Sequence, residues 1–372
     1  MIRLSDVITR FEADYLQQYG HALLPSQRQA LVAMKQCRSA MAPRMLAACS
    51  ACDETRLVPH SCGHRACPHC QHHESQQWLE RQLKRQVPAD YFLLTFTVPA
   101  ELRPLAWQHQ RAFYAILFDC AWATVNTFSR NDKHLQACPG AVAVLHTHSR
   151  RLEYHPHVHL AMPAAALDQE HRRWRTKPRR RRKGKPGQGY LFNQAALAKV
   201  FRAKLLAALA AEGLSVPVGV TAQWVVDCKG VGNGEKALVY LGRYLYRGVI
   251  QEKDILACEN GQVRFRYRDS QTGKHTVRTV SGAAFLHLVL QHVLPKGFRR
   301  ARNYGFLHPN SKTLIALLQV LLRVMPSPAW VKPRPPWTCP CCGAPMRVVR
   351  RRMSLSEGMR IRPTGVAGEV TR

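Results

Sequence analysis

The first residues able to do chemistry are the histidines in the stretch His155-Pro156-His157-Val158-His159. Successive side chains in a β-strand face opposite ways, so His157 and His159 would project on one face with α-carbons about 6.7 Å apart. Two imidazoles at that spacing can bind one divalent cation, although a solvated histidine-rich strand is the alternative. His155 shares the face but lies about 13 Å from His159, which leaves it as either a third ligand or a supporting group. Further candidates for the third ligand are Glu153 and His146.

A second pattern is the pair of tyrosines in Tyr240-Leu241-Gly242-Arg243-Tyr244. Asn233 can cap a helix here and Gly248 can end it, and residues four apart lie on one helical face. Arg243 and Arg247 fall along the same flank, where a guanidinium group can hold a phosphate and favour the phenolate form of tyrosine. Two tyrosines at helical spacing are more often half-buried structural aromatics, but the arginines on the same flank favour a functional pair that acts at a phosphate.

A third pattern is formed by cysteines. Cys49 and Cys52 make one CxxC pair, and fourteen residues later Cys67 and Cys70 make another. Two such pairs can enclose one tetrahedral zinc with no open position, which indicates a structural site. Further or substitute ligands between the pairs are His60, Cys62 and His64. Near the end of the chain, the stretch 339–343 offers one more pair, which lacks two ligands, so the sequence leaves open whether a second zinc binds there.

The composition indicates a nucleic-acid partner. The 372 residues contain 55 Lys and Arg against 23 Asp and Glu, a formal charge of +32, and 46% are apolar, which is enough for a folded core. Apolar runs of membrane-spanning length and a signal-peptide pattern are missing from the sequence. We therefore expect a cytoplasmic protein, associated with the bacterial nucleoid, in which the cysteine pairs bind metal rather than form disulfides.

The elements that must position these residues follow from periodicity. Alternating apolar residues predict a strand over 92–98, a hairpin of strands over 141–147 and 153–162, and a second hairpin beginning near Val263 that turns arginines to solvent. Helical patterns cover 103–130 and the stretch from Asn193 to Glu212. We expect three domains: a zinc-binding, DNA-binding domain over 1–90, a catalytic domain over 91–312, and a basic C-terminal region over 313–372.

The order of these motifs resembles the two-tyrosine HUH transposases of rolling-circle insertion sequences. The resemblance rests on the strand ending at Pro99, the stretch 155–159, the stretch 240–244 and the amino-terminal cysteines. It implies an α+β fold, an HUH endonuclease domain with a central antiparallel sheet and helices on one face, preceded by a small zinc-binding domain. It also implies that His157 and His159 bind catalytic Mg²⁺ or Mn²⁺, and that Tyr240 and Tyr244 attack DNA.

The implied substrate is DNA, as single-stranded or hairpin ends of a mobile element, and the implied intermediate is a 5′-phosphotyrosine. Two other functions remain open at this point: a plasmid or phage replication initiator or relaxase with the same chemistry, and a non-enzymatic zinc protein that only binds DNA. The segment from Arg172 to Lys185 has ten basic residues in fourteen, and we expect it to be a loop that contacts phosphates.

Overall fold

The computed structural model describes residues 2–39, 41–177, 191–246, 248–269, 272–324 and 337–353, and its largest element is an antiparallel sheet. The strand order is β7-β6-β4-β5-β3-β8, and β12 also pairs with β4. The confirmed fold is therefore α+β with an antiparallel sheet. The strands are β3 (Tyr91–Thr97), β4 (Cys138–His148), β5 (Tyr154–Pro163), β6 (Ala165–Asp168), β7 (Arg173–Thr176), β8 (Val226–Gly230) and β12 (Ala301–Gly305).

The expected histidine hairpin is formed by β4 and β5, which are the most completely buried strands of the sheet. In the β4–β5 register His157 lies opposite His146, and His159 lies opposite Val144. On its other edge β5 pairs with β3, so that His159 is opposite Thr95. Because side chains alternate across a strand, these neighbours place His146, His157 and His159 on one face of the sheet.

One face of this sheet is covered by α5 and α6, which enclose the largest apolar core together with Phe96 and Leu160. The helix expected over 103–130 is divided at His109 into α4 (Arg103–Gln108) and α5 (Gln110–Asn131). The next helix, α6 (Gln194–Ala211), begins as expected at Asn193, whose side chain accepts a hydrogen bond from the amide of Ala196 at 2.9 Å.

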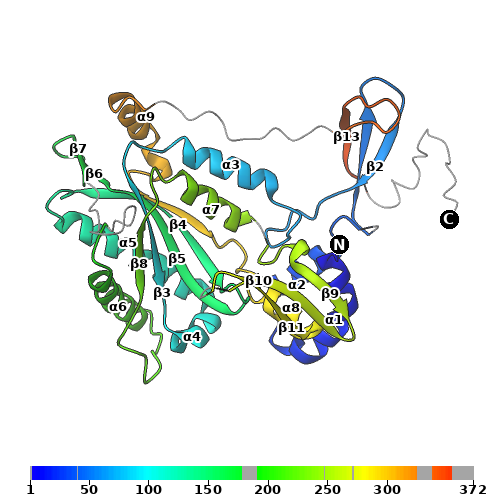
Figure 1. Ribbon diagram of the computed structural model, residues 1–372, viewed down its shortest axis with the longest axis horizontal. Coiled ribbons are helices and arrows are strands. Elements are labelled where there is room, and N and C mark those ends of the chain that lie inside the picture. Colours follow the sequence, from blue (N-terminus) through cyan, green and yellow to red (C-terminus); the bar gives the residue numbers. More distant parts are fainter. Residues whose placement is uncertain are drawn as a thin grey trace.

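The other face is covered too, by α3 (His72–Leu83), α7 (Glu235–Tyr246) and α9 (Lys312–Leu321) (Figure 1). The expectation of helices on one face only was therefore wrong. The reason is visible in β4 and β5, where residues that point to both faces are buried, a pattern typical of a strand enclosed between two layers. As expected, α7 lies over the histidine-bearing strands.

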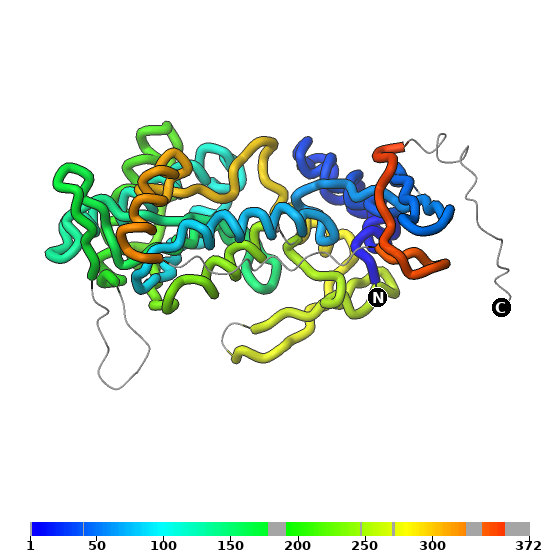
Figure 2. The backbone as a smooth tube through the Cα atoms, turned by 90° about the horizontal axis from the view of Figure 1, so that it is seen from above, coloured from blue at the N-terminus to red at the C-terminus, as the bar shows by residue number. Residues whose placement is uncertain are grey.

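A second body joins the start of the chain to residues 255–290. It contains α1 (Leu4–Tyr19), α2 (Pro25–Gln36), α8 (Gly282–Leu290) and a sheet of β9 (Ile255–Glu259), β10 (Gln262–Arg268) and β11 (His275–Ser281). Phe11, Phe265 and Phe285 share its core. The predicted arginine-bearing hairpin is β10 and β11, which projects from the molecule (Figure 2).

A third unit is a small sheet in which β1 (Arg44–Cys49) pairs with β2 (Thr55–Pro59) and with β13 (Met346–Met353). Residues of the expected 1–90 block thus lie in more than one packing unit, and residues of the expected C-terminal region complete one of them. Short 3₁₀ turns lie at Gly20–Ala22, Ala100–Leu102, Glu252–Asp254 and Pro309–Ser311.

The basic segment expected as a loop from Arg172 to Lys185 is only partly described. Arg173–Thr176 form the edge strand β7, paired with β6, so this part was wrongly expected to be a loop. Residues 178–190 lie outside the described residues. Over the part of the chain that the structure describes, none of the helices has the length and apolar character to cross a membrane.

Candidate active site and metal centres

Three buried imidazoles meet on the sheet face beneath α7. His146 comes from β4, and His157 and His159 come from β5; each is exposed by less than a tenth. One ligand nitrogen from each residue lies within 4.8 Å of the other two. Among the residues that the structure describes, the buried Nε2 of His146 has no hydrogen-bond partner. An orphaned buried nitrogen is costly unless something binds it, so this group fits a cation.

Neighbouring groups orient two of these rings. Nδ1 of His157 lies 2.7 Å from the carbonyl oxygen of His155, and Nδ1 of His159 lies 2.9 Å from the hydroxyl oxygen of Thr95. A carbonyl can only accept, so Nδ1 of His157 carries the proton and its Nε2 keeps a free lone pair. Outer contacts of this kind hold ligand histidines in one tautomer and one orientation.

Burial keeps the three imidazoles neutral. It lowers the pKa of His159 to about 4, and it lowers the pKa values of His146 and His157 well below the usual range, with the neighbouring histidines adding to the effect. Neutral imidazole is the form that binds metals. The cluster is therefore ready to accept a cation at neutral pH.

The structure places the other ligand candidates outside this cluster. Nδ1 of His155 accepts a hydrogen bond from the Arg103 guanidinium at 2.9 Å, so His155 supports the site through its backbone carbonyl and not through its ring. Glu153 instead faces the guanidinium groups of Arg151 and Arg278, at 3.6 and 3.4 Å. The third imidazole beside His157 and His159 is that of His146.

Tyr244 lies directly against the cluster. Its ring stacks on the ring of His146, with centroids 3.2 Å apart and planes 7° apart. Its hydroxyl group lies 2.7 Å from Nδ1 of His148. Burial also lowers the pKa of His148 well below its usual range, so this imidazole is neutral and its Nδ1 can accept the hydrogen bond of the Tyr244 hydroxyl group.

A guanidinium group that the motifs did not single out lies over Tyr244. Arg300 is 4.8 Å from the centre of the tyrosine ring, and its Nε donates to the carbonyl oxygen of Leu145 on β4 at 3.1 Å. Burial raises the pKa of Tyr244 and the positive charge of Arg300 opposes that rise. Arg300 is therefore a positive charge beside Tyr244 that the sequence motifs did not indicate.

Tyr240 occupies the open side of the site. Its ring centroid lies 6.0 Å from those of His146 and His159, yet 47% of the residue is exposed. Both tyrosines of the motif thus lie beside the histidine cluster, Tyr240 largely exposed and Tyr244 half-buried. Arg243 is exposed on the same helix, and Arg247 lies outside the described residues.

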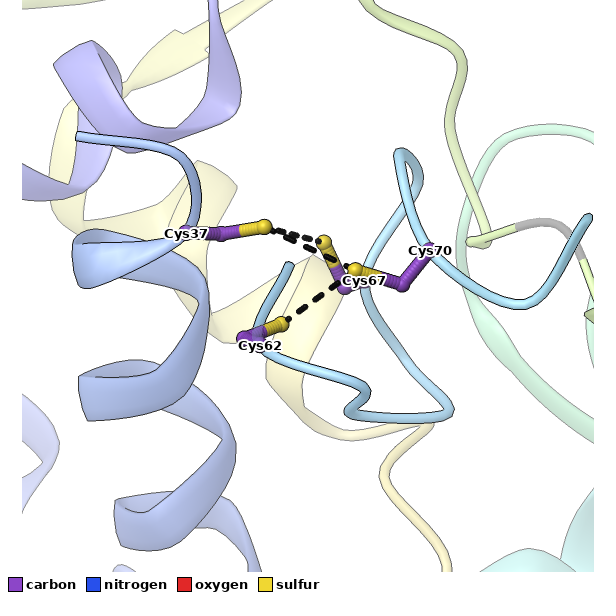
Figure 3. A group of neighbouring side chains, drawn as sticks. All are labelled: Cys37, Cys62, Cys67 and Cys70. Atoms are coloured by element: carbon purple, nitrogen blue, oxygen red, sulfur yellow. Dashed lines mark hydrogen bonds between the residues drawn. The ribbon is translucent and has the colours of Figure 1, made fainter. Parts of the chain in front are cut away.

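The cysteines form two groups in place of the single one expected. Cys67 and Cys70 lie with Cys37 and Cys62, whereas Cys49 and Cys52 lie with Cys339 and Cys342 (Figure 3 shows the first group). The prediction that the two CxxC pairs share one zinc was therefore wrong. Cys62 does become a ligand candidate, as one of the alternatives suggested, while His60 and His64 lie outside both groups.

The first group has the dimensions of a zinc site. Sulfur atoms lie 3.5 Å apart for Cys37 and Cys67, and 3.6 Å apart for both Cys37–Cys70 and Cys62–Cys70. A tetrahedral zinc with about 2.3 Å bonds requires sulfurs about 3.8 Å apart. Hydrogen bonds from the other three thiols lower the pKa of Cys70, which favours a thiolate within the group.

Three residues of the candidate sites, Cys37, His148 and Arg300, were not predicted from the sequence, each for a different reason. Cys37 stands alone, outside any CxxC pair, and only the packing of α2 brings it to the first group. His148 follows His146 by two residues, so the alternation of β4 could have predicted it on the same face. Arg300 carries no local signal, because its contact with Tyr244 depends on the pairing of the following strand, β12, with β4.

Comparison with known proteins gives two family matches and two relatives. Residues 140–313 match a family described as a putative transposase, and residues 7–98 match one described as a transposase zinc-binding domain. The chain is 32% identical to the putative transposase y4qJ of Sinorhizobium fredii over 82% of this chain and 80% of that protein. It is 31% identical to the transposase for insertion sequence element IS801 of Pseudomonas savastanoi pv. phaseolicola, over 69% of this chain and 63% of that protein. No solved structure matches it.

Proposed function

This chain belongs to the two-tyrosine transposases of insertion sequences that carry an amino-terminal zinc-binding domain, and we propose that it cuts one DNA strand through a tyrosine. The observation that carries the proposal is the position of Tyr240 and Tyr244 on one helix beside three converging imidazoles. The cut leaves a 5′-phosphotyrosine and a free 3′-hydroxyl, and the second tyrosine repeats the exchange so that the element moves by a rolling-circle route.

His146, His157 and His159 would hold the catalytic cation. When bound, the cation polarises the scissile phosphate and offsets the charge that builds up on its oxygens. Imidazole ligands suit manganese better than magnesium, which prefers oxygen. Of the two cations that the family implies, we therefore expect Mn²⁺ to support more cleavage than Mg²⁺ at equal concentration.

His148 provides a destination for the proton of Tyr244. As the phenol oxygen bonds to phosphorus, the bond from phosphorus to the 3′-oxygen breaks, the phenolic proton passes to Nδ1 of His148, and the 3′-oxygen takes up a proton. Arg300 lies over the same ring and lowers the cost of the negative charge on the oxygen during attack. The number of bonds to phosphorus is conserved, so no external energy source is needed.

The substrate is DNA with an exposed strand, at the single-stranded or hairpin ends of the element. The excess of 32 positive charges supports binding to phosphates without regard to sequence. The exposed aromatic ring of Tyr240 beside the histidine cluster suits an unpaired base more than a closed duplex.

The first cysteine group is proposed to bind a structural zinc that maintains the amino-terminal domain.

The decisive experiment is a denaturing gel of protein incubated with single-stranded element ends and Mn²⁺. We expect a covalent adduct with the wild-type protein and none with the Tyr240→Phe, Tyr244→Phe double variant. The Tyr267→Phe variant, on β10, is the matched control and should form as much adduct as wild type. An adduct that persists in the double variant would overturn the assignment of the nucleophiles.

A companion experiment separates catalysis from binding. The His157→Ala, His159→Ala double variant should bind the same DNA but form at least a hundredfold less adduct, since it lacks two of the three imidazoles. DNA binding by the wild-type protein without any adduct, under either cation, would favour a protein that only binds DNA.

A further inference from the structure

The second cysteine group is built by segments from the two ends of the described chain. Cys49 and Cys52 lie at the end of β1 and in the turn that follows it, and Cys339 and Cys342 lie in the turn before β13. Neither family match reaches residues 339–342, because the matched regions are 7–98 and 140–313. Only half of the group, Cys49 and Cys52, thus lies within the matched zinc-binding domain, and the other half comes from a segment that neither match covers.

The sulfur atoms are spaced for one tetrahedral ion. Cys49 and Cys342 are 3.4 Å apart, Cys52 and Cys342 are 3.6 Å apart, and Cys52 and Cys339 are 3.7 Å apart. Those separations are close to the roughly 3.8 Å expected around zinc and far too long for a disulfide bond of about 2.05 Å. All four sulfurs lie within 4.8 Å of one another, which four unrelated surface thiols would not do.

The backbone around the group forms two turns, each of which carries one pair of the cysteines. The amide of Ala51 donates to Sγ of Cys49 at 3.3 Å, and the amide of Gly343 donates to the carbonyl oxygen of Cys339 at 2.9 Å. The two turns are joined directly, since the amide of Ser50 donates to the carbonyl oxygen of Pro345 at 3.1 Å. Gly343 has φ of +74°, a conformation that lets the chain reverse after the second pair.

The sheet that carries these turns has almost no apolar core of its own. Ala47, Cys339 and Met346 form its whole buried cluster among the residues described. A core of this size cannot offset the conformational entropy of the ordered strands, so such units need a metal or a disulfide. The cysteines here are free thiols, which leaves a metal.

We propose that Cys49, Cys52, Cys339 and Cys342 bind a second structural zinc ion, which joins the C-terminal strand β13 to the amino-terminal strands β1 and β2. Four thiolates in a tetrahedron favour zinc over oxygen-preferring cations. With every position filled by protein the ion is structural and has no place for substrate. The sequence left open whether residues 339–343 bind a second zinc, because two ligands were missing, and the two missing ligands lie about 290 positions earlier in the chain.

Metal analysis of the purified full-length protein tests this site by comparing the zinc content per chain of cysteine variants with that of the wild-type protein. The Cys342→Ser variant should contain one zinc fewer per chain than wild type, and the Cys62→Ser, Cys342→Ser double variant should contain two fewer. Cys341→Ser is the matched control, since Cys341 is exposed in the same turn but lies outside the group, and its zinc content should equal that of wild type. Unchanged zinc in Cys342→Ser, or iron in place of zinc, would overturn the proposal.

Thiol labelling of the unmodified protein keeps the test valid if a serine variant fails to fold. Cys341 and Cys342 are both exposed, so without a metal both should react with iodoacetamide at similar rates. In the zinc-loaded protein we expect Cys342 to be protected at least tenfold relative to Cys341, and a chelator should remove that protection. Equal labelling of the two residues before chelation would refute the site without bearing on the tyrosine chemistry.

Discussion

At the scale of single residues, the two tyrosines of one motif have unequal surroundings. Tyr240 is 47% exposed, whereas the hydroxyl group of Tyr244 is directed to His148 and its ring is held between His146 and Arg300. Four residues advance a helix by about 6 Å, so both hydroxyls can reach one bound phosphate, but at different times. We infer that Tyr240 makes the first cut and Tyr244 the second.

This order predicts different products from the two single variants. On a short single-stranded oligonucleotide with one cleavage site, Tyr240→Phe should reduce adduct formation at least tenfold. Tyr244→Phe should retain most of the adduct formation on this oligonucleotide. It should fail only in the second reaction, in which the strand is transferred to the other end of the element. Mass spectrometry of the adduct peptide identifies the attacking residue. Adducts shared equally between the two tyrosines would contradict the inferred order.

At the scale of elements, a glycine before α7 sets where the nucleophile helix begins. Gly234 has φ of +85°, and a β-carbon there would lie 2.4 Å from the Cγ atom of Tyr91 on β3. Tyr91 is buried, so its ring cannot move aside. The close contact between Gly234 and β3 therefore fixes the distance of α7 from the sheet that carries the histidines.

Gly234→Ala should lower the free energy of unfolding by about 1–3 kcal/mol and reduce adduct formation, because strain and overlap displace the start of α7. Gly232→Ala is the matched control: its φ is also positive, at +65°, but a β-carbon there meets nothing within 4 Å. Thermal denaturation and the gel assay measure the two effects. Equal losses in both variants would show that backbone strain alone, and not the contact with Tyr91, is responsible.

A second element-scale contact joins the first cysteine group to the active site. Arg65, between Cys62 and Cys67, donates to the carbonyl oxygens of Leu294, Pro295 and Phe298 at 2.7 to 2.9 Å. The same stretch of chain leads directly to Arg300. The zinc-binding segment thus supports the loop that positions the guanidinium over Tyr244.

The Arg65→Ala variant should retain its zinc. Its transfer to the second end of the element should fall more than its first-strand cleavage, because the loop held by Arg65 positions Arg300 over Tyr244. Removing hydrogen bonds from a charged donor should also lower the free energy of unfolding by a few kcal/mol. The control is Arg28→Ala, exposed on α2. A variant with normal transfer, or one that loses zinc, would count against this connection.

At the scale of the whole molecule, buried histidines make stability depend on pH. Burial lowers the pKa of His292 to about 3, and the unfolded chain has a histidine pKa near its ordinary value of about 6.5. Between those two values the unfolded state binds a proton that the folded state does not. The stabilising contribution is therefore complete above pH 6.5 and is lost as the pH falls toward 3.

We expect the free energy of unfolding in urea to fall between pH 6.5 and pH 5 by about 2 kcal/mol from His292 alone, at about 1.36 kcal/mol for each pH unit. His292→Gln should make that pH dependence smaller by the same amount. His275→Gln, at an exposed position on β11, should leave it unchanged. A variant at His292 with the slope of the wild-type protein would disprove the linkage.

The sequence by itself determined the geometry within each element. The alternation of a strand put His157 and His159 on one face, and the helical period put Tyr240 beside Tyr244, because both repeats are properties of the local backbone. The α6 boundaries were equally local, since the capping side chain of Asn193 acts within one turn. Charge and the order of motifs were enough to identify the family.

Only the tertiary structure decided which groups meet across distant parts of the chain. Cysteine spacing paired Cys49 with Cys67, but packing joined Cys67 to Cys37 and Cys49 to Cys342. Likewise, the packing of β12 against β4 brought Arg300 to Tyr244, and helices covered both faces of the sheet in place of one. These choices depend on how strands pair and cores close over hundreds of residues, and local periodicity carries no information about that.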